Sequence, residues 1–420
     1  MLALINILMW IFGAVLCILF IFLAFTGTII VISLFKKPLR HSYRPKFSIV
    51  VPAYNESKNI ASCLKSIMRS RYPKDLFEVI VVDDGSTDDT VKIARSFRGV
   101  KVLKINHKGK SAALNHGIKN AMNELVMTVD SDTMLHPDAL AKMVAPFKDE
   151  RIGATSGTYK VDNHKNMLTS FQSIEYAYNS LIRMAFSRVY ADSVWFYGAM
   201  SCYRVHALKS VGNMHSDVLA EDMDIAIRLQ NKGYNVVHVH DAFSYTVVPE
   251  TFASFFRQRI RWWTGVLQSM RKNRKASYKN MRTSHPVPLI FVYVSQWWWS
   301  VFSILSFPMF TIQIIYWLPQ NAPFFEVFMY IFRWFSLFGP LYVIYKIPDW
   351  GISFFSIFGI LSGIISVTFI IMSMNIFKED IRLREVLAII FYFPYTLLLN
   401  MVMMISVFKY LLYDSRGFVK

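Results

Sequence analysis

"VMTVDSDTML" (residues 126–135) is the stretch that decides the fold. An uninterrupted apolar strand ends there on two aspartates, Asp130 and Asp132, separated by one serine. Neighbouring carboxylates repel each other unless a cation neutralises them, and hard divalent cations prefer such oxygen ligands. The stretch therefore predicts a buried strand, and its carboxyl end is either a polar strand end or a metal site that in turn holds a diphosphate.

Apolar strands alternate with helices along this part of the chain. Strand patterns are predicted at 47–52, 77–85, 99–105 and 124–130, with helices between them. Such alternation is typical of a parallel sheet covered by helices on both faces, so we expect an α/β, Rossmann-like domain. Ligands bind beyond the carboxyl ends of such strands, and the pair Asp83–Asp84 ends a second strand. Four carboxylates are thus expected at one edge of the sheet.

Long segments without charged residues flank this domain. They cover 1–35, 283–325, 350–377 and 386–408, and a weaker one at 327–345 is interrupted by Arg333. About 20 apolar residues suffice for a membrane-spanning helix. The sequence predicts a multi-pass membrane protein with one N-terminal span, either a long helix or a hairpin turning near Gly27, and three or four C-terminal spans.

The C-terminal topology has two solutions. If 286–318, 327–347, 352–376 and 386–413 all cross, the segment 377–385 lies on the far side of the membrane. Its three basic residues mildly oppose that placement, since basic residues favour the cytosolic side. Either 327–347 is re-entrant, or the mixed charge of 377–385 weakens this preference.

Almost all of the net charge of +18 lies in residues 36–283. The basic run at 36–46 follows the first apolar segment directly, which predicts a cytosolic insert at the plasma membrane. The charge suits anionic lipid headgroups, anionic substrates or both, and no motif points to nucleic acid. The three scattered cysteines predict no disulfide framework: Cys17, Cys63 and Cys202.

Two further stretches carry candidate site residues at predicted helix starts. "HKGKSAALNHG" (107–117) places Lys108 and Lys110 beside a glycine, as phosphate contacts or as a solvated basic turn. "LAEDMDIAIRLQNKGY" (219–234) opens on Glu221 and Asp222. These acids either stabilise the helix dipole, or one of them is a general base.

"TFASFFRQRIRWWTGVLQSM" (251–270) predicts an amphipathic helix at the membrane interface. Its apolar stripe, expected to lie in lipid, is Phe252, Phe256, Ile260, Trp263, Leu267 and Met270. The opposite face gathers Gln258, Arg261, Trp262 and Gly265. Arginine suits a phosphate and an indole suits a sugar, while the alternative is a plain amphipathic anchor.

Together these motifs resemble the membrane-embedded processive glycosyltransferases of family 2, which include poly-N-acetylglucosamine, hyaluronan and cellulose synthases. The motifs stand in order as Asp83–Asp84, Asp130–Asp132, Glu221–Asp222 and Gln258–Arg259–Ile260–Arg261–Trp262, with "VPAYNES" (51–57) before them. The resemblance covers residues 1–280 and implies a cytosolic GT-A domain (36–245). It also implies a transmembrane segment (1–35), amphipathic interface helices (246–283) and C-terminal transmembrane helices (284–420).

The resemblance also implies roles for individual residues. The nucleoside site is lined by Ala53, Tyr54, Glu56 and Asp84, the UDP moiety meets Lys110 and Asp130, and Mg²⁺ or Mn²⁺ is held by Asp132 with Asp130. Asp222, beside Glu221, becomes the general base. Gln258 and Arg261 contact the donor side and Trp262 stacks on the acceptor sugar. Tyr197 replaces a small residue of the acceptor loop.

The implied reaction is inverting, processive transfer from a UDP-sugar, foremost UDP-N-acetylglucosamine, to a β-linked polysaccharide exported through the membrane. Alternatives are a hyaluronan- or cellulose-type synthase with another donor, or single addition to a lipid acceptor. We found no cyclic-dinucleotide-binding region, which disfavours cellulose. A non-catalytic scaffold is disfavoured because every expected carboxylate is present. Accessory subunits and oligomers stay open.

Overall fold

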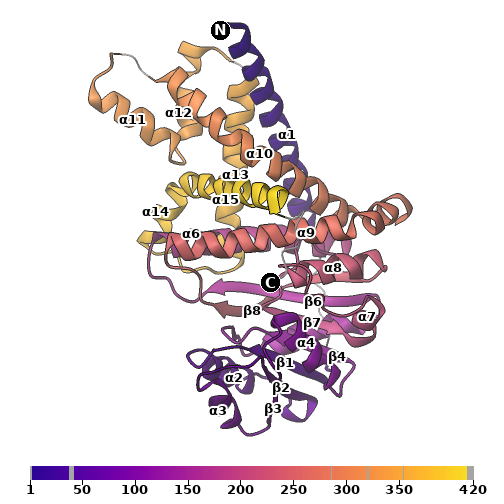
Figure 1. Ribbon diagram of the computed structural model, residues 1–420. Coiled ribbons are helices and arrows are strands. Elements are labelled where there is room, and N and C mark those ends of the chain that lie inside the picture. Colours follow the sequence, from indigo (N-terminus) through magenta and orange to yellow (C-terminus); the bar gives the residue numbers. More distant parts are fainter. Residues whose placement is uncertain (1, 37–41, 285, 319–320, 353, 414–420) are drawn as a thin grey trace.

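The structure, a computed structural model, describes residues 2–36, 42–284, 286–318, 321–352 and 354–413. It has two parts, an α/β domain built on one sheet and a set of apolar helices stacked on that domain (Figure 1). Residues 37–41 of the predicted basic run lie outside the described residues.

The sheet has eight strands in the order β3-β2-β1-β4-β7-β6-β8-β5. The strands are β1 (Phe47–Ala53), β2 (Phe77–Asp83), β3 (Val100–Lys104), β4 (Leu125–Val129), β5 (Met134–Leu135), β6 (Ile152–Val161), β7 (Met200–Arg204) and β8 (Asn235–Thr246). From β3 to β4 all neighbours are parallel, which confirms the parallel sheet predicted from the sequence. The other half is mixed, because β7 runs antiparallel to both β4 and β6.

Helices cover both faces of the sheet. One face carries α2 (Ile60–Met68), α3 (Thr90–Arg95) and α5 (Ala139–Val144); the other carries α4 (Lys110–Lys119), α7 (Val205–Ser210) and α8 (Glu221–Asn231). Short 3₁₀ turns lie at Lys74–Leu76 and Ala145–Lys148.

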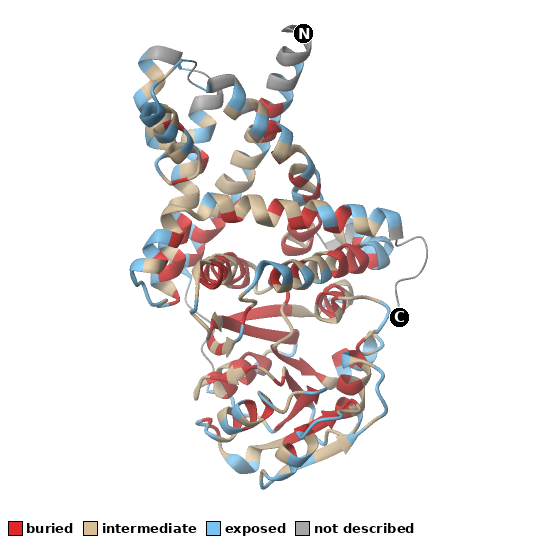
Figure 2. Ribbon diagram, turned by 60° about the vertical axis from the view of Figure 1, so that its left-hand side comes forward, coloured by how far each residue is buried: buried red, intermediate tan, exposed pale blue. Residues whose placement is uncertain are grey.

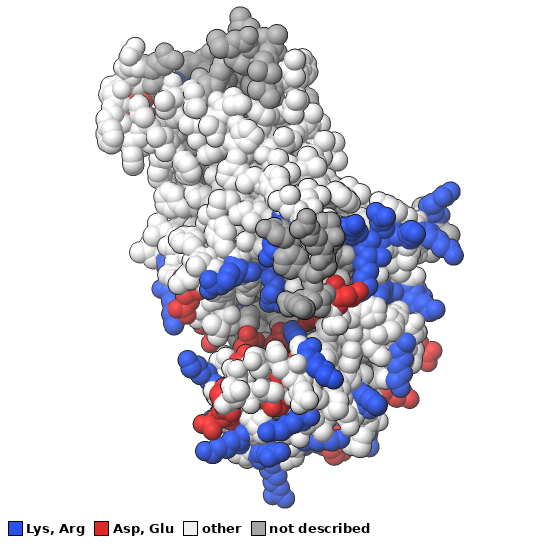
Figure 3. Space-filling model, in the orientation of Figure 1, with Lys and Arg blue, Asp and Glu red and all other residues white. Residues whose placement is uncertain are grey.

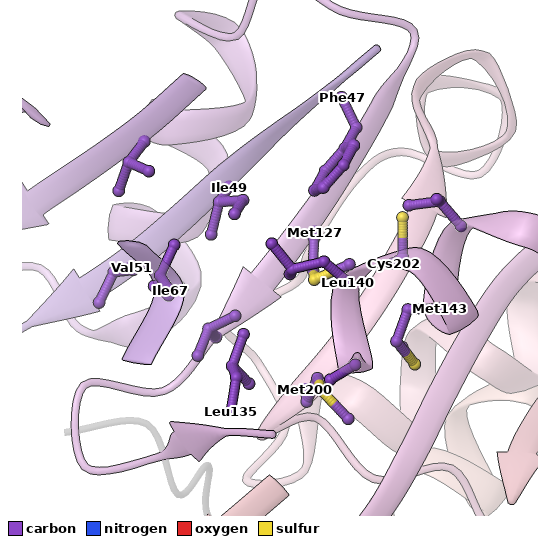
Figure 4. Close-up of a cluster of buried hydrophobic side chains, with 14 of the residues drawn as sticks. Phe47, Ile49, Val51, Ile67, Met127, Leu135, Leu140, Met143, Met200 and Cys202 are labelled. Atoms are coloured by element: carbon purple, nitrogen blue, oxygen red, sulfur yellow. The ribbon is translucent and has the colours of Figure 1, made fainter. Parts of the chain in front are cut away.

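Alternate side chains of β1 pack on opposite faces of the sheet. Ile49 and Val51 belong to the cluster beneath α2 and α5, and Val50 belongs to the cluster beneath α4. All three are fully buried, which explains the uninterrupted apolar strand. Figure 2 shows most of the sheet coloured as buried. Figure 4 shows the first cluster, in which Leu140 and Met143 lie over the strands. Burial of each such side chain is worth about 1.5–3 kcal/mol.

Helix α6 (Met167–Tyr190) lies between the sheet and the apolar helices (Figure 1). It begins at a capping box, in which Oδ1 of Asn166 accepts the backbone N–H of Thr169 at 3.0 Å. Leu181 and Phe186 on α6 share a buried cluster with residues of three apolar helices, among them Ile30, Leu289 and Phe369. α6 is therefore the platform on which the membrane helices rest.

The remaining helices are α1 (Leu2–Phe35), α9 (Phe252–Ser284), α10 (Val287–Trp317), α11 (Phe324–Trp334), α12 (Gly339–Trp350), α13 (Phe354–Ile376), α14 (Leu383–Ile390) and α15 (Tyr392–Tyr413). Within the described residues, four segments are long and apolar enough to span a membrane: Trp10–Phe35, Val287–Ile312, Ile357–Ile376 and Tyr392–Leu412. Figure 3 shows this part of the surface almost bare of charge, whereas lysines and arginines cover the α/β domain and one end of α9. The protein is therefore a membrane protein.

The structure corrects three details of the expected topology. α1 is one helix through Gly27, so the hairpin alternative is wrong. The segment 327–347 is divided between α11 and α12, two helices too short to span a membrane. α15 lies alongside α9 across the base of the bundle rather than lengthwise with α1 and α13 (Figure 1).

The segment 377–385 contacts the α/β domain. Nζ of Lys160 on β6 lies 3.3 Å from Oε1 of Glu379, and Oγ of Ser173 on α6 donates to the other oxygen of Glu379 at 3.2 Å. Oγ of Ser170 donates to Glu385 at 2.9 Å. This segment therefore lies on the same side as the α/β domain, which contradicts the solution that placed it across the membrane and agrees with its basic residues.

Candidate active site

Several strand and helix ends meet at one edge of the sheet. β1 ends at Ala53, β2 ends at Asp83, and Asp130 follows the end of β4. Backbone bonds hold these ends together, since the N–H of Asp84 donates to the carbonyl of Ala53 at 2.8 Å. The N–H of Asp130 donates to the carbonyl of Ala199 at 3.0 Å. The strand ends that Asp84 and Asp130 follow therefore lie at one edge of the sheet.

Asp84 supports the loop that leads into α4. It is 3% exposed, and its two carboxylate oxygens accept the backbone N–H groups of Lys108 and Gly109, each at 2.8 Å. Beside this loop the ring of Tyr54 stacks on His107, with ring centroids 4.2 Å apart. Tyr54 is exposed, so the pair offers a flat surface on which a nucleobase can stack. His107 was not predicted as a site residue from the sequence.

Lys110 lies between the predicted metal-binding residue Asp130 and the acidic start of α8. Its Nζ lies 2.7 Å from Oδ1 of Asp130 and 3.2 Å from Oε1 of Glu221. Loss of hydration favours the neutral amine, but the two carboxylates outweigh it and raise the pKa of Lys110 well above its usual value. Burial likewise opposes the charge of Glu221, yet Lys110 and the helix N-terminus leave the pKa of Glu221 below its usual value.

Asp132 lies among carboxylates. Burial, followed by the charges of Asp130 and Glu56, raises the pKa of Asp132 to about 6. Oε2 of Glu56 accepts a hydrogen bond from Asn59 at 2.8 Å. Among the described residues no three acidic, histidine or cysteine side chains form a metal cage. Mg²⁺ commonly takes one or two carboxylates and completes its shell with phosphate and water, so the pair Asp130–Asp132 fits an ion shared with a diphosphate.

Asp222 is held by backbone groups. Its Oδ2 accepts the N–H of Gly198 at 2.8 Å, and its Oδ1 accepts the N–H of Met223 at 2.8 Å. Burial and the neighbouring charge of Glu221 raise the pKa of Asp222 to about 6. A carboxylate with this pKa is mostly ionised at pH 7 and still basic enough to take a proton from a hydroxyl.

The polar face of α9 lies against the start of α8. A Cβ on Gly265 would lie 2.5 Å from the backbone N of Ala220, so only glycine permits this approach. One turn earlier, Arg261 is close enough to Glu221 to help lower its pKa. The predicted residues Gln258 and Trp262 lie on the same helix and are half-buried. The structure thus brings the motif Gln258–Arg259–Ile260–Arg261–Trp262, written QxxRW below, to the carboxylates of α8.

The apolar stripe of α9 faces protein. Phe256, Ile260 and Trp263 pack against the cluster of Tyr395 and Val402 on α15, and Leu267 contacts Met403 there. The expectation that this stripe lies in lipid is therefore wrong for these residues. An apolar stripe that packs against another helix and one that lies in lipid have the same residue pattern, so the sequence does not distinguish them.

Two buried arginines were given no role from the sequence. Arg259, inside the QxxRW motif, pairs with Glu175 of α6 at 2.9 Å. Arg183 of α6 is fully buried, donates to Ser156, and lies with its Cζ 4.2 Å from the ring centroid of Tyr197. Burial lowers the pKa of Arg183. The available signal was a single arginine within the apolar run "LIRMAF" (181–186).

Residues 45–265 match the family described as "Glycosyltransferase like family 2". A protein of Staphylococcus epidermidis named poly-beta-1,6-N-acetyl-D-glucosamine synthase is 30% identical over 284 residues, which cover 66% of this chain and 68% of that protein. The protein of the same name from Staphylococcus aureus (strain COL) is 33% identical over 225 residues, 52% of this chain and 54% of that one.

A solved structure with a similar fold is a mannosyltransferase from Pyrobaculum calidifontis in complex with GDP-Man and Mn²⁺. The TM-score is 0.56 at 19% identity, and the superposition covers 96% of this chain and 99% of that one. At this identity the likeness shows the fold alone, and it extends over the α/β domain and most of the helices.

Proposed function

The chain belongs to the family 2 glycosyltransferases, and we propose that it is a processive synthase of a β-linked N-acetylglucosamine polymer. The observation that supports this most is the position of Lys110, which bridges Asp130 on the donor side to Glu221, next to the candidate base Asp222. The residues proposed to bind the donor and those proposed to activate the acceptor then lie in one site. The names of the two staphylococcal relatives favour this polymer over hyaluronan or cellulose.

In the proposed reaction the acceptor hydroxyl attacks the anomeric carbon of UDP-N-acetylglucosamine. The bond from that carbon to the diphosphate oxygen breaks, UDP leaves with the electron pair, and the hydroxyl proton passes to Asp222. Attack in line with the leaving group inverts the configuration, so an α-linked donor gives a β-linked product. Gly198 and Met223 orient the carboxylate of Asp222 for this step.

The departing UDP gains negative charge in the transition state. Lys110 and Arg261 are cations of this chain that would stabilise that charge, and Lys110 is already held by Asp130 and Glu221 before the reaction. Mg²⁺ or Mn²⁺ held by Asp132 and Asp130 would neutralise the diphosphate when bound. Ala53, Tyr54, Glu56 and Asp84 would form or support the nucleoside end of the donor site.

We place the α/β domain (36–245) and the interface helix (246–283) in the cytosol at the plasma membrane, between the N-terminal segment 1–35 and the helices of 284–420. The basic charge of residues 36–283 and the contact of 377–385 with the α/β domain support this orientation. Trp262 of α9 would stack on the acceptor sugar near the membrane helices, from where the polymer would be exported.

The test is a donor panel of UDP-N-acetylglucosamine, UDP-glucose and UDP-glucuronate with the purified chain and Mg²⁺ or Mn²⁺, read by UDP release and product size. We expect long products from UDP-N-acetylglucosamine alone, and none after chelation of the metal. Asp222→Asn should abolish transfer and leave UDP binding nearly unchanged. Long products from another donor would replace the proposed substrate, and a single added sugar on a lipid would replace processive synthesis.

A further inference from the structure

A buried ion pair joins three helices behind the polar face of α9. Nη2 of Arg259 on α9 lies 2.9 Å from Oε2 of Glu175 on α6, and the same oxygen accepts the hydroxyl of Tyr395 on α15. Arg259 is 2% exposed and Glu175 is 8% exposed. A buried ion pair is often no more stabilising than apolar side chains of the same volume, so this pair calls for an explanation other than stability.

The guanidinium of Arg259 is enclosed by aromatic rings. Its Cζ lies 4.5 Å from the ring centroid of Trp262, which is one turn further along α9. Phe255 and Tyr176 lie at 5.3 Å and 5.6 Å from the same atom. A cation over the face of an indole attracts the ring and restricts its orientation. Arg259 therefore has one fixed position, and the nearest ring to it is that of Trp262.

The chain of contacts runs from the membrane helices to the QxxRW motif. Tyr395 and Glu175 fix Arg259, and Arg259 contacts Trp262. Trp262 itself is only half-buried, so part of its indole stays accessible. Glu175 is thus buried too deeply to touch a sugar. Trp262, which it contacts through Arg259, lies at the surface of the site.

We propose that Glu175 and Arg259 are positioning residues that hold the indole of Trp262 in the orientation that receives the acceptor sugar. This inference rests on the proposed function, because that function gives Trp262 its acceptor role. The hydroxyl of Tyr395 makes the same orientation depend on α15, the last of the apolar helices.

The experiment is a double-mutant cycle on the full-length chain in detergent or nanodiscs. Arg259→Lys keeps the charge but loses the planar fork, and Trp262→Ala removes the ring. Initial rates of UDP release are measured against the concentration of a short N-acetylglucosamine oligomer at saturating donor, and then against donor at saturating oligomer. Arg259→Lys is expected to raise the acceptor KM about tenfold and to leave the donor KM unchanged.

In the Trp262→Ala background, Arg259→Lys is expected to add no further loss, because Arg259 acts through the ring. Additive losses, or an equal rise in both KM values, would overturn the inference. Tyr395→Phe removes one oxygen only and is expected to raise the acceptor KM about threefold, while the protein still unfolds in a single cooperative transition. This variant carries the test if Arg259→Lys does not fold, and an unchanged acceptor KM would then count against the inference.

Glu385→Gln is the matched control. Glu385 is a buried carboxylate that also binds α6, through Ser170, and it further contacts His164 and Arg384. It should alter thermal stability without changing the acceptor KM. If the wild type adds only one sugar, the proposal of polymer synthesis is wrong, but the acceptor KM values of the double-mutant cycle still test the positioning role of Arg259. If the wild type makes polymer and the losses are additive, only the positioning role of Glu175 and Arg259 is wrong.

Discussion

The backbone N–H of Gly198 donates to Oδ2 of Asp222 over 2.8 Å, and no side chain fits between them. A Cβ at position 198 would lie 2.9 Å from Cβ and 3.0 Å from Oδ2 of Asp222. Gly198→Ala should therefore displace the candidate base and lower the transfer rate at least tenfold, while UDP affinity stays within about twofold. UDP release and calorimetric titration with UDP measure the two quantities. Normal transfer by this variant would show that the carboxylate of Asp222 does not need this position.

The transfer rate should depend on the ionisation of Asp222. Its pKa is raised to about 6, and only the ionised form accepts a proton, so the rate should rise with pH through about 6 and level off above 7. Below pH 6 the rate should fall about tenfold per pH unit. A pH profile of UDP release at saturating donor and acceptor measures this.

Asp132 has a similar pKa of about 6, so the profile needs a control. A midpoint that moves to lower pH when the metal concentration is raised tenfold belongs to the metal-binding carboxylates. A midpoint that stays in place belongs to Asp222. A flat profile between pH 5 and 7 would exclude Asp222 as the base.

Lys110 should contribute mainly to donor binding. It lies between Asp130 and Glu221, and a charged hydrogen bond is worth about 1.5–3 kcal/mol, so Lys110→Met should weaken UDP binding about 10- to 100-fold. Lys108→Met is the matched control, since its exposed side chain is on the same loop and its backbone N–H still binds Asp84. Equal effects of the two substitutions would mean that only the general basic charge matters.

Gly265 sets the distance between α9 and α8. In Gly265→Ala the new methyl would meet the backbone of Leu219 and Ala220 at 2.5–2.8 Å, which forces the helices apart. Overpacking of this kind destabilises by about 1–3 kcal/mol, and the displacement of Arg261 from Glu221 should lower transfer as well. Thermal unfolding and UDP release measure both effects.

Gly359→Ala on α13 is the control for this substitution, because a Cβ there has no atom within 4 Å. It should keep full activity and normal stability. Loss of stability without loss of transfer in Gly265→Ala would mean that the spacing of the two helices does not matter for the reaction.

Local patterns predicted the parts of the fold that are set by neighbouring residues. The run 47–53 is buried at every position, so its apolar composition was sufficient to identify a strand between two helical layers. Lys110 and Glu221 were recognised as helix starts because glycine and acidic residues mark those positions, and both helices begin there. The mixed half of the sheet has no such signal, since strand direction is decided by long-range pairing.

The contacts of single side chains across the fold could not be read from the sequence. Glu175 and Arg259 are 84 residues apart, and neither shows its partner in the local pattern. The sequence showed that α9 has an apolar stripe but not that α15 covers it, because hydropathy is the same for a neighbouring helix and for lipid. His107 was missed since its stacking on Tyr54 depends on how two loops approach each other.

The attachment of residues 377–385 limits how the catalytic half can move. α6 has 24 residues and is about 36 Å long. Glu379 and Glu385 accept hydrogen bonds from serines in its first two turns. Near its last turn Arg188 donates to the carbonyl of Ser33 on α1 at 3.4 Å. Because α6 is attached at both ends, it cannot rotate relative to α1 and the segment 377–385 without breaking these contacts. If the protein is the processive synthase proposed above, each added sugar would advance past an α/β domain that keeps its position relative to the membrane helices.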